Sequence, residues 1–498
     1  MKKRLAIALI LGLLLVLAIA GAVLAEGGID LQHLSGSGWW VSWQVQNVGT
    51  QTANLQVQVI SADGEPPHTS SATTQLDPGE AVSFVPGKPD PGLQPPLPEG
   101  FIGSAVLSAD QPIVAIGNVA NNPLPSFGLG VQGGVAAGQY QGVSGDDAAT
   151  EVLFPLLKND FAGQTTTFYV QAAGQAASVT MTYKTNDGKT YTDGPYSLNA
   201  DVMHVFSPDS VSGLPKSCPG PSSTATCVGS AVATSSSGPI AGVYAEHPTT
   251  GDPASFVLSS RGFTPKDADT IAAAPVIKNE WSGRTTALTV QNAETSADVT
   301  VNVTFTGNKG ACAGQSYSGT QYTLAPGESK IWFPNLGNVG GMPANCFAAA
   351  KVTAEGGKVV AIVNESGGAK KTVYSAFGVT NATRNTALPL VKEFFNKRTT
   401  GVVIQNTGEA ATDVTVEYNV VGGSPVSLPT FSIPAGQSVS LFQISRRPGV
   451  WGPAVTQLDG TNNGVMIRST SENVVAIAQE SGTTEEVDIK NYEGFNTQ

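Results

Sequence analysis

The sequence predicts an all-β protein built from four tandem antiparallel β-sandwiches behind an N-terminal signal segment. Three observations predict this fold class. Two short phrases recur four times at nearly constant separation, apolar and polar residues alternate with a period of two inside each copy, and turn residues bracket the alternating stretches. Composition agrees, because charged residues make up only 13% of the chain and glycine is abundant at 57 residues.

The first 25 residues have the pattern of a secretory signal peptide. Lys2, Lys3 and Arg4 form a positive start, residues 5–22 are almost uninterruptedly apolar, and the segment closes on Ala25. We expect cleavage there. The apolar run is also long enough to span a bilayer, so an uncleaved N-terminal anchor is the alternative. Export to the cell surface or beyond is predicted either way.

The strongest signal is internal repetition. The first phrase ends at Gln46, Gln171, Gln291 and Gln405, at intervals of 125, 120 and 114 residues. The second phrase follows 70, 72, 71 and 72 residues after the matching glutamine, and ends at Ile116, Val243, Ile362 and Ile477. Two phrases that keep their separation through four copies indicate an array of one structural unit.

Within a copy, strict alternation predicts strands with one buried and one solvated face, as at Val299, Val301 and Val303. Asp-Gly and Gly-Gly pairs predict hairpin turns, and Pro-Gly corners such as Pro326–Gly327 recur in three copies. The second copy has residues 198–201 in place of that corner. About seven short strands in roughly 115 residues predict two packed sheets per copy, an immunoglobulin-like sandwich by pattern.

The predicted boundaries follow the copies. We expect a signal peptide at 1–25, a first sandwich at 26–128, a flexible Gly/Ala-rich linker at 129–147, and further sandwiches at 148–267, 268–383 and 384–498. Separate sandwiches on linkers predict an extended, beads-on-a-string molecule. Copies 2 to 4 each open with a Pro-led apolar segment, for which the first copy offers residues 29–31.

The pattern of residues 388–406, Leu-Pro-Leu-Val-Lys followed by Thr-Thr and an apolar-Gln-Asn turn, resembles tandem immunoglobulin-like domains of bacterial secreted and cell-surface proteins. Uncharacterised exported proteins of filamentous green non-sulfur bacteria are similar. The resemblance covers all four copies. It implies a sandwich fold, an extracellular setting, and service as spacers, adhesins or carbohydrate-contacting modules, with no catalytic residue to carry over.

The four cysteines all lie in the middle two copies. An even number of cysteines in an exported chain predicts disulfides, and we expect Cys218 to pair with Cys227 and Cys312 with Cys346. A four-cysteine zinc site is the alternative, but two separate domains would have to converge to build it.

The cluster Trp39, Trp40 and Trp43 is the most suggestive candidate for ligand contact. By strand parity Trp43 belongs to the core and Trp39 caps it, so only Trp40 is expected to point outward, with Ser42 and Gln44. Trp40 is therefore the candidate ligand residue. The four recurrent glutamines and the asparagines after them are predicted to bond backbone groups in the following turns.

No constellation predicts catalysis or a metal or other cofactor. Glu246, Glu365 and Glu480 recur after the second phrase, where the first copy has Val119. One carboxylate per domain does not make the pair that a glycosidase needs, so we expect these residues to be solvated. A hydrolase would require an interdomain cleft.

The sequence therefore predicts a non-catalytic extracellular or cell-surface structural or adhesion protein, a multi-domain spacer or assembly subunit. The alternative is a carbohydrate-binding protein that uses the first domain. Expected partners are other surface proteins or further copies in a filament or sheath, and extracellular polysaccharide in the alternative. The net charge of −12 disfavours nucleic acid, and a membrane contact is expected only through the N-terminal segment.

Overall fold

The structure is a computed structural model. It describes residues 22–24, 38–62, 68–70, 73–88, 92–94, 97–98, 100–218, 225–251, 254–367, 370–441, 458–482 and 489–497. These residues form eight antiparallel sheets, joined by turns and short 3-10 segments. The predicted all-β class and antiparallel sandwich architecture are confirmed. Within the described ranges, no helix is long and apolar enough to cross a membrane.

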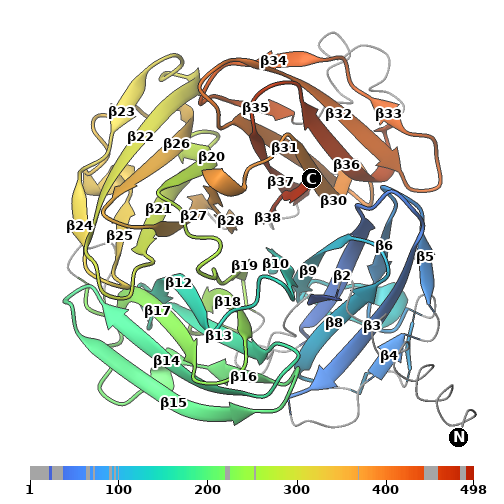
Figure 1. The fold of residues 1–498 in the computed structure, drawn as a ribbon, viewed down its shortest axis with the longest axis horizontal. Helices are drawn as coiled ribbons and strands as arrows, with labels where there is room; N and C mark the ends of the chain where they lie inside the picture. Colours follow the sequence, from blue (N-terminus) through green and yellow to red (C-terminus); the bar gives the residue numbers. More distant parts are fainter. Residues whose placement is uncertain are drawn as a thin grey trace, which may run out of the picture.

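The eight sheets pack as four pairs, which we call sandwiches 1 to 4 in chain order (Figure 1). The outer sheet of sandwich 1 consists of β1 (Ala22–Leu24), β3 (Ala53–Ser61), β4 (His68–Ser70), β5 (Thr74–Leu76), β7 (Leu93–Gln94), β8 (Gly103–Ala109) and β11 (Val143–Ser144). Its inner sheet consists of β2 (Trp40–Asn47), β6 (Ala81–Phe84), β9 (Ile113–Ala120) and β10 (Ala137–Gln141). The short helix η1 (Pro125–Phe127) lies between β9 and β10 in the chain.

Sandwich 2 has the simplest pairing. Its outer sheet consists of β12 (Glu151–Lys158), β17 (Val228–Ser235), β14 (Ala177–Thr185) and β15 (Thr190–Leu198), in that order. Its inner sheet consists of β16 (Met203–Phe206), β13 (Gln164–Ala172), β18 (Ile240–Pro248) and β19 (Leu258–Arg261), with η2 (Pro208–Ser210) after β16.

Sandwiches 3 and 4 repeat this arrangement. The outer sheet of sandwich 3 consists of β20 (Ile271–Asn279), β22 (Val299–Gly310), β23 (Ser316–Ser318), β24 (Tyr322–Leu324), β26 (Cys346–Glu355) and β29 (Phe377–Gly378). Its inner sheet consists of β21 (Thr285–Asn292), β25 (Ser329–Trp332), β27 (Val359–Gly367) and β28 (Lys370–Ser375), and its short helices are η3 (Pro334–Leu336) and η4 (Val379–Asn381).

The outer sheet of sandwich 4 consists of β30 (Asn385–Glu393), β32 (Thr412–Val420), β33 (Val426–Ser427), β34 (Phe431–Ile433), β36 (Thr461–Ser469) and β39 (Phe495–Thr497). Its inner sheet consists of β31 (Arg398–Asn406), β35 (Ser438–Leu441), β37 (Val474–Gly482) and β38 (Ile489–Glu493).

The strand order, which the sequence left open, is visible in sandwich 2. Counting its strands from one to eight, the outer sheet runs one-six-three-four and the inner sheet runs five-two-seven-eight. The constant immunoglobulin domain distributes its strands differently, with ABED in one sheet and CFG in the other. The other sandwiches keep the order of sandwich 2, but their fourth strand is split into two short pieces and a further strand, β11, β29 or β39, pairs with the first.

The two layers of each sandwich are buried differently. Outer strand β14 alternates between buried and half-buried residues, as the period of two predicts. Inner strands such as β9 and β18 are buried at every position. An inner sheet therefore has protein on both faces. One face packs on its own outer sheet and the other on the preceding sandwich.

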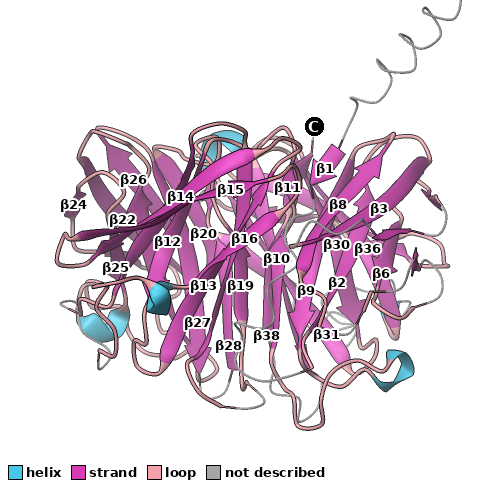
Figure 2. Ribbon diagram, turned by 90° about the horizontal axis from the view of Figure 1, so that it is seen from below, coloured by secondary structure: helices cyan, strands magenta, loops and turns pink. Residues whose placement is uncertain are grey.

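This packing continues around the whole molecule. The core of sandwich 1 includes Val243 of sandwich 2, and the core of sandwich 2 includes Ile362 of sandwich 3. The core of sandwich 3 includes Ile477 of sandwich 4, and the core of sandwich 4 includes Ile116 of sandwich 1. The four sandwiches thus form a closed ring, seen face-on in Figure 1 and edge-on as a low cylinder in Figure 2.

The last strand of each inner sheet lies at the middle of this ring (Figure 1). We call β10, β19, β28 and β38 the axial strands. Ser260 of β19 and Ser375 of β28 are joined by a hydroxyl–hydroxyl hydrogen bond of 2.9 Å, and the N–H of Ser375 donates to Glu493 of β38. Since β10 contacts both β19 and β38, strands from all four sandwiches meet at the centre.

Two expectations from the sequence are wrong. Residues 137–144, assigned to a flexible linker at 129–147, form β10 and β11, because their backbone completes the two sheets of sandwich 1. The extended arrangement is also wrong, because each core continues into the next sandwich. The predicted signal peptide lies outside the described residues except at β1, which pairs with β8 and β11. Residues 29–31 also lie outside them.

Candidate functional site

The most constrained polar site in the ring is a set of buried carboxylates between the inner sheets. Glu246, Glu365 and Glu480 are only 2%, 1% and 1% exposed, so the expectation that they are solvated is wrong. The neighbouring sandwich covers the sheet face that strand parity assigned to solvent. The three residues lie at equivalent places, opposite Thr166, Thr286 and Thr400.

Each of these carboxylates pairs with a lysine from the first strand of its own sandwich. The Lys158–Glu246, Lys278–Glu365 and Lys392–Glu480 ion pairs measure 2.6, 2.8 and 2.9 Å. The three lysines end the Pro-led opening segments of copies 2 to 4. Their backbone N–H groups donate to the threonines opposite the glutamates, at 3.1, 2.9 and 3.0 Å. The repeat therefore encodes one buried motif three times.

Side-chain amides of the next sandwich complete this motif at two boundaries. Asn364 of sandwich 3 donates to Glu246 at 3.1 Å, and Gln479 of sandwich 4 donates to Glu365 at 3.0 Å. We call these groups the Lys–Glu–amide triads. At the boundary between sandwiches 4 and 1, Arg398 and Lys490 approach Glu480 instead, at 3.3 and 3.6 Å.

The boundary between sandwiches 1 and 2 lacks both the glutamate and the amide of this motif. The glutamate position is Val119, and the amide position of the next copy is Ala245. The carboxylate and its amide partner are thus replaced together by apolar residues. This fits a direct contact, because either polar group left alone in the buried interface would cost free energy.

Neighbouring cations lower the pKa of two of these glutamates, Glu365 and Glu480. Burial by itself would raise the pKa of Glu365, but Lys278 and Arg284 outweigh it and hold this pKa below its ordinary value. In the same way Lys392, Lys490 and Arg398 overcome burial and lower the pKa of Glu480. Enclosed carboxylates fixed by cations are suited to hold sheets together. They have no free face toward a substrate.

A second polar cluster lies on the ring axis. Four equivalent positions of the axial strands converge there and carry four different side chains: Gln141, Arg261, Ser375 and Glu493. Arg261 forms a bidentate ion pair with Asp267, at 2.7 and 3.0 Å. Burial raises the pKa of Glu493 above its ordinary value. Because the copies differ at this position, an amide, a guanidinium, a hydroxyl and a carboxyl group meet at the axis.

These four side chains line an axial cavity of about 80 Å³. Organic ligands occupy pockets of roughly 300–1,000 Å³, so this cavity suits water or a single small ion. One layer along the axis, the side chains of Ser259 and Asn491 are buried and make no hydrogen bond with the described residues. The interior of the ring axis is therefore polar.

The structure also places the residues singled out from sequence. Trp43 is 3% exposed in the core and Trp39 packs on its edge, as predicted. Trp40, the candidate ligand residue, is half-buried, and its indole N–H donates to the carbonyl of Asn122 at 3.0 Å. Ser42 and Gln44, expected to point outward with it, are buried.

The recurrent amides take the predicted turn roles. Gln46, Gln171, Gln291 and Gln405 each donate to a carbonyl in the corner turn, at 3.0, 3.1, 3.2 and 3.4 Å. Asn47 donates to Gln51 and Leu76, and Gly49 donates to Asn47. Copy 2 has Ala172 at the asparagine position, and there the Asp201 carboxylate accepts from Gly174 at 2.8 Å. The irregular corner of copy 2 compensates for the missing asparagine.

The four cysteines form two disulfides. Cys218 bonds to Cys227, and Cys312 bonds to Cys346, with Cα–Cα distances of 6.0 and 5.3 Å. Each pair lies within one sandwich. Among the described residues, no group of three or more His, Cys, Asp or Glu side chains is arranged to hold a metal ion.

Comparison with known proteins gave no family. No family model matches the chain, and no curated protein matches it. Several solved structures are partly similar. Thermotoga maritima 1070 has 16% identity and a TM-score of 0.20, and the match covers 24% of this chain and 97% of that one. The Anabaena sensory rhodopsin transducer has 15% identity and a TM-score of 0.15, with 19% of this chain and 92% of that one covered, and the major pilin of Streptococcus pyogenes has 8% identity and a TM-score of 0.12, with 70% of this chain and 99% of that one covered.

Proposed function

We propose that this chain is an exported, non-catalytic structural protein whose four sandwiches act together as one rigid, ring-shaped subunit at the cell surface. The observation that carries the proposal is the cyclic sharing of cores, closed by Ile116 of sandwich 1 inside the core of sandwich 4. A ring held by shared apolar cores moves as one body, because opening any boundary exposes apolar surface.

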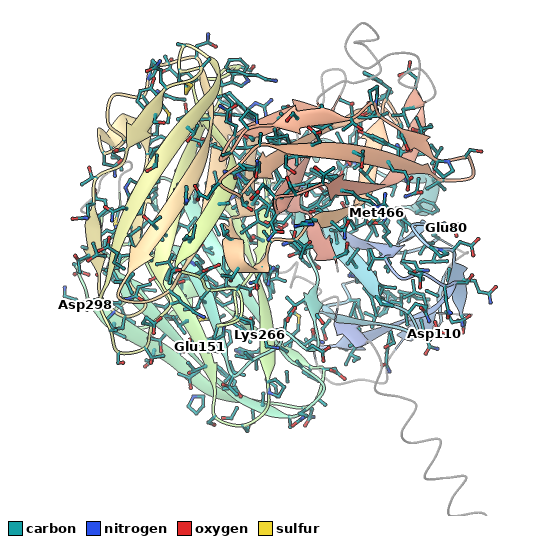
Figure 3. All side chains as sticks on the ribbon, turned by 45° about the horizontal axis from the view of Figure 1, so that its top comes forward. Glu80, Asp110, Glu151, Lys266, Asp298 and Met466 are labelled. Carbon is teal, nitrogen blue, oxygen red and sulfur yellow. A yellow bond between two sulfur atoms is a disulfide. The ribbon has the colours of Figure 1, made fainter. Side chains whose placement is uncertain are left out.

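The ring favours an assembly or adhesion subunit over a spacer. A spacer gains length by placing domains end to end, whereas these sandwiches lie side by side around an axis (Figures 1 and 2). The outward surface consists of four outer sheets, and the turn residues Glu80, Asp110 and Asp298 lie at its rim in Figure 3. Such a rim offers several similar surfaces to partners or to further copies.

Export is supported by the disulfides and by the N-terminal pattern. Disulfides persist in oxidising compartments and are rare in the cytosol. The recurrent glutamates support a non-catalytic role. A glycosidase needs two carboxylates that reach the substrate, whereas these carboxylates are buried and bound to cations.

Whole cells test this proposal. A protease added outside intact cells should remove the protein, and thiol alkylation without reductant should leave all four cysteines unmodified. Negative-stain images of the purified full-length chain should show rings, free or joined into arrays. Protection from the protease together with free thiols would contradict an exported protein. Turnover of a polysaccharide by the purified protein would contradict the non-catalytic assignment.

Binding of extracellular polysaccharide is a second candidate function. Trp40 does not favour it, because its ring is half-buried and its N–H is bonded within the chain. The observation that does favour it lies on sandwich 2.

A further inference from the structure

A groove crosses the surface at the boundary of sandwiches 1 and 2. Its volume is about 280 Å³, near the lower end of the roughly 300–1,000 Å³ usual for ligand sites. Most of its lining comes from the end of β15, the following corner and the start of β16, and Ala62 beyond β3 completes it. This is also the boundary at which Val119 and Ala245 replace the buried glutamate and amide.

An aromatic pair forms one wall of the groove. The rings of Tyr196 and His204 stack with centroids 3.9 Å apart and planes inclined by 25°. Phe206 meets Tyr196 edge-on at 5.5 Å, and the Tyr196 hydroxyl donates to Asp193 at 2.8 Å. These contacts fix the ring before any ligand arrives. Tyr196 is nevertheless 36% exposed, one of three exposed large hydrophobic side chains in the described part of the chain.

The fold itself does not require this pair. The positions equivalent to Tyr196, read from the strand registers, are occupied by Thr74, Tyr322 and Phe431. The positions equivalent to His204 are occupied by Val82, Lys330 and Val439. Sandwich 1 folds with threonine and valine in these two places. The stacked Tyr196–His204 pair is therefore particular to sandwich 2 and to its groove.

The lining also specifies the chemistry of a ligand. Besides Tyr196 and His204 the lining contains Ser197, Asn199 and apolar side chains, and among the described residues it includes no lysine, arginine or carboxylate. Such a surface offers one aromatic face and neutral hydrogen-bonding groups. An ionic ligand would find no counter-charge among these lining residues, and a purely apolar ligand would leave the Asn199 amide and the Ser197 hydroxyl unpaired.

We propose that this groove binds a neutral saccharide, with a sugar ring packed on Tyr196, which His204 supports by stacking, and with the sugar hydroxyls bonded by Asn199 and Ser197. A pyranose has an apolar C–H face and a rim of hydroxyls, which matches an aromatic wall beside neutral polar groups. The size of the groove accommodates one or two sugar units. The site goes beyond the proposed structural role and does not depend on it.

The test uses the full-length chain expressed with its own export segment. Calorimetry and affinity electrophoresis would measure binding to a panel of neutral saccharides, namely glucan, mannan, xylan, galactan and chito-oligosaccharides. The informative variants carry the residues of sandwich 1, Tyr196→Thr and His204→Val, and are therefore compatible with the fold. Tyr322→Thr is the matched control on sandwich 3. Unchanged melting temperatures would establish that the variants are folded.

We expect at least one panel member to bind, Tyr196→Thr to weaken its binding tenfold or more, His204→Val to weaken it several-fold, and Tyr322→Thr to leave it unchanged. Absence of binding across the panel would overturn the proposal. Equal binding by wild type and both groove variants would also overturn it, and loss only in Trp40→Ala would assign the site to sandwich 1. Each of these outcomes leaves the ring architecture untouched.

Discussion

Glu365 of sandwich 3 accepts a hydrogen bond from the side-chain amide of Gln479 in sandwich 4, at 3.0 Å. The same carboxylate is bound by Lys278 at 2.8 Å and by Arg284 at 2.7 Å. Residues 114 positions apart thus join two sandwiches through one buried charge. The contact explains why the glutamate and the amide of the following copy occur together at two boundaries and are both replaced at the boundary of sandwiches 1 and 2.

Removing the lysine of this triad should destabilise the ring. In Lys278→Met, Glu365 loses the more deeply buried of its two cations, and loss of one partner of a buried pair costs about 3–5 kcal/mol. Urea unfolding would measure the loss. Lys351→Met is the control, because Lys351 pairs with an exposed Glu409 and such surface pairs contribute about 0–1 kcal/mol. Equal effects of the two variants would argue against a structural role for the triad.

Closure of the ring depends on close packing at Gly464. A β-carbon there would lie 2.4 Å from the Gln46 amide nitrogen and 2.8 Å from the carbonyl of Gly79, both across the boundary to sandwich 1. Figure 3 labels Met466 and Glu80 on the two sides of this boundary. Gly464→Leu should separate sandwiches 4 and 1, increase the radius of gyration and accelerate proteolysis. Val421→Leu, at a position 48% exposed, is the control. An unchanged scattering profile for Gly464→Leu would contradict closure at this contact.

The turn asparagines should contribute measurably to stability. Asn406 is fully buried, donates to Ala410 and Ile433 at 2.7 and 3.0 Å, and accepts from Gly408 at 2.9 Å. Asn406→Ala leaves those backbone groups without partners, at a cost of about 1–3 kcal/mol. Thermal or urea unfolding would show it. Asn54→Ala, whose partner Asp110 is on the surface, should change stability by about 0.5 kcal/mol or less. A neutral Asn406→Ala would indicate that water replaces the amide.

One buried carboxylate should make stability depend on pH. Burial raises the pKa of Glu393 to about 8. The folded state therefore holds a proton that the unfolded chain releases near pH 4.5, so Glu393 favours folding most at low pH and loses that contribution as the pH rises to about 8. Glu393→Gln removes this dependence, and copies 2 and 3 carry Asn159 and Asn279 at the equivalent place.

Urea unfolding at pH 5 and pH 8.5 would measure this effect. The stability of Glu393→Gln relative to wild type should increase by several kcal/mol between the two pH values, since one pKa unit corresponds to about 1.4 kcal/mol. Glu409→Gln, at an 89% exposed carboxylate, should follow wild type at both. A relative stability that does not change with pH would show that Glu393 is ionised in the folded protein.

The sequence predicted the units better than their arrangement. Alternation at Val299, Val301 and Val303, the core position of Trp43 and the amide-bonded turns are all local features, which a strand period and turn chemistry determine. Closure of the ring depends on contacts between copies, such as that of Ile116 with the core of sandwich 4. A pattern of neighbouring residues in the sequence cannot predict such contacts. The inner strands were the one place where parity failed in a way that indicates the ring. Gln46, Gln171 and Glu365 lie on faces that strand parity predicts to be exposed, and the neighbouring sandwich buries them.

The candidate sites were harder to predict for the same reason. The lysines of the triads end the opening segments, and no local pattern predicts that they pair with residues such as Glu246, because each pair joins two different sheets. Recurrence of the glutamate together with an amide in the following copy was the signal that could have revealed it. Residues 137–144 read as a linker because small residues next to the crowded axis resemble a flexible segment in composition.

Small-angle scattering from the monodisperse full-length protein tests the closed ring most directly. A compact chain of this length should have a radius of gyration of about 23 Å, whereas four separate sandwiches on a string should give about 40 Å. The account predicts the compact value, independent of concentration, with a profile that matches a low cylinder. A radius near 40 Å would contradict the ring and restore the extended spacer.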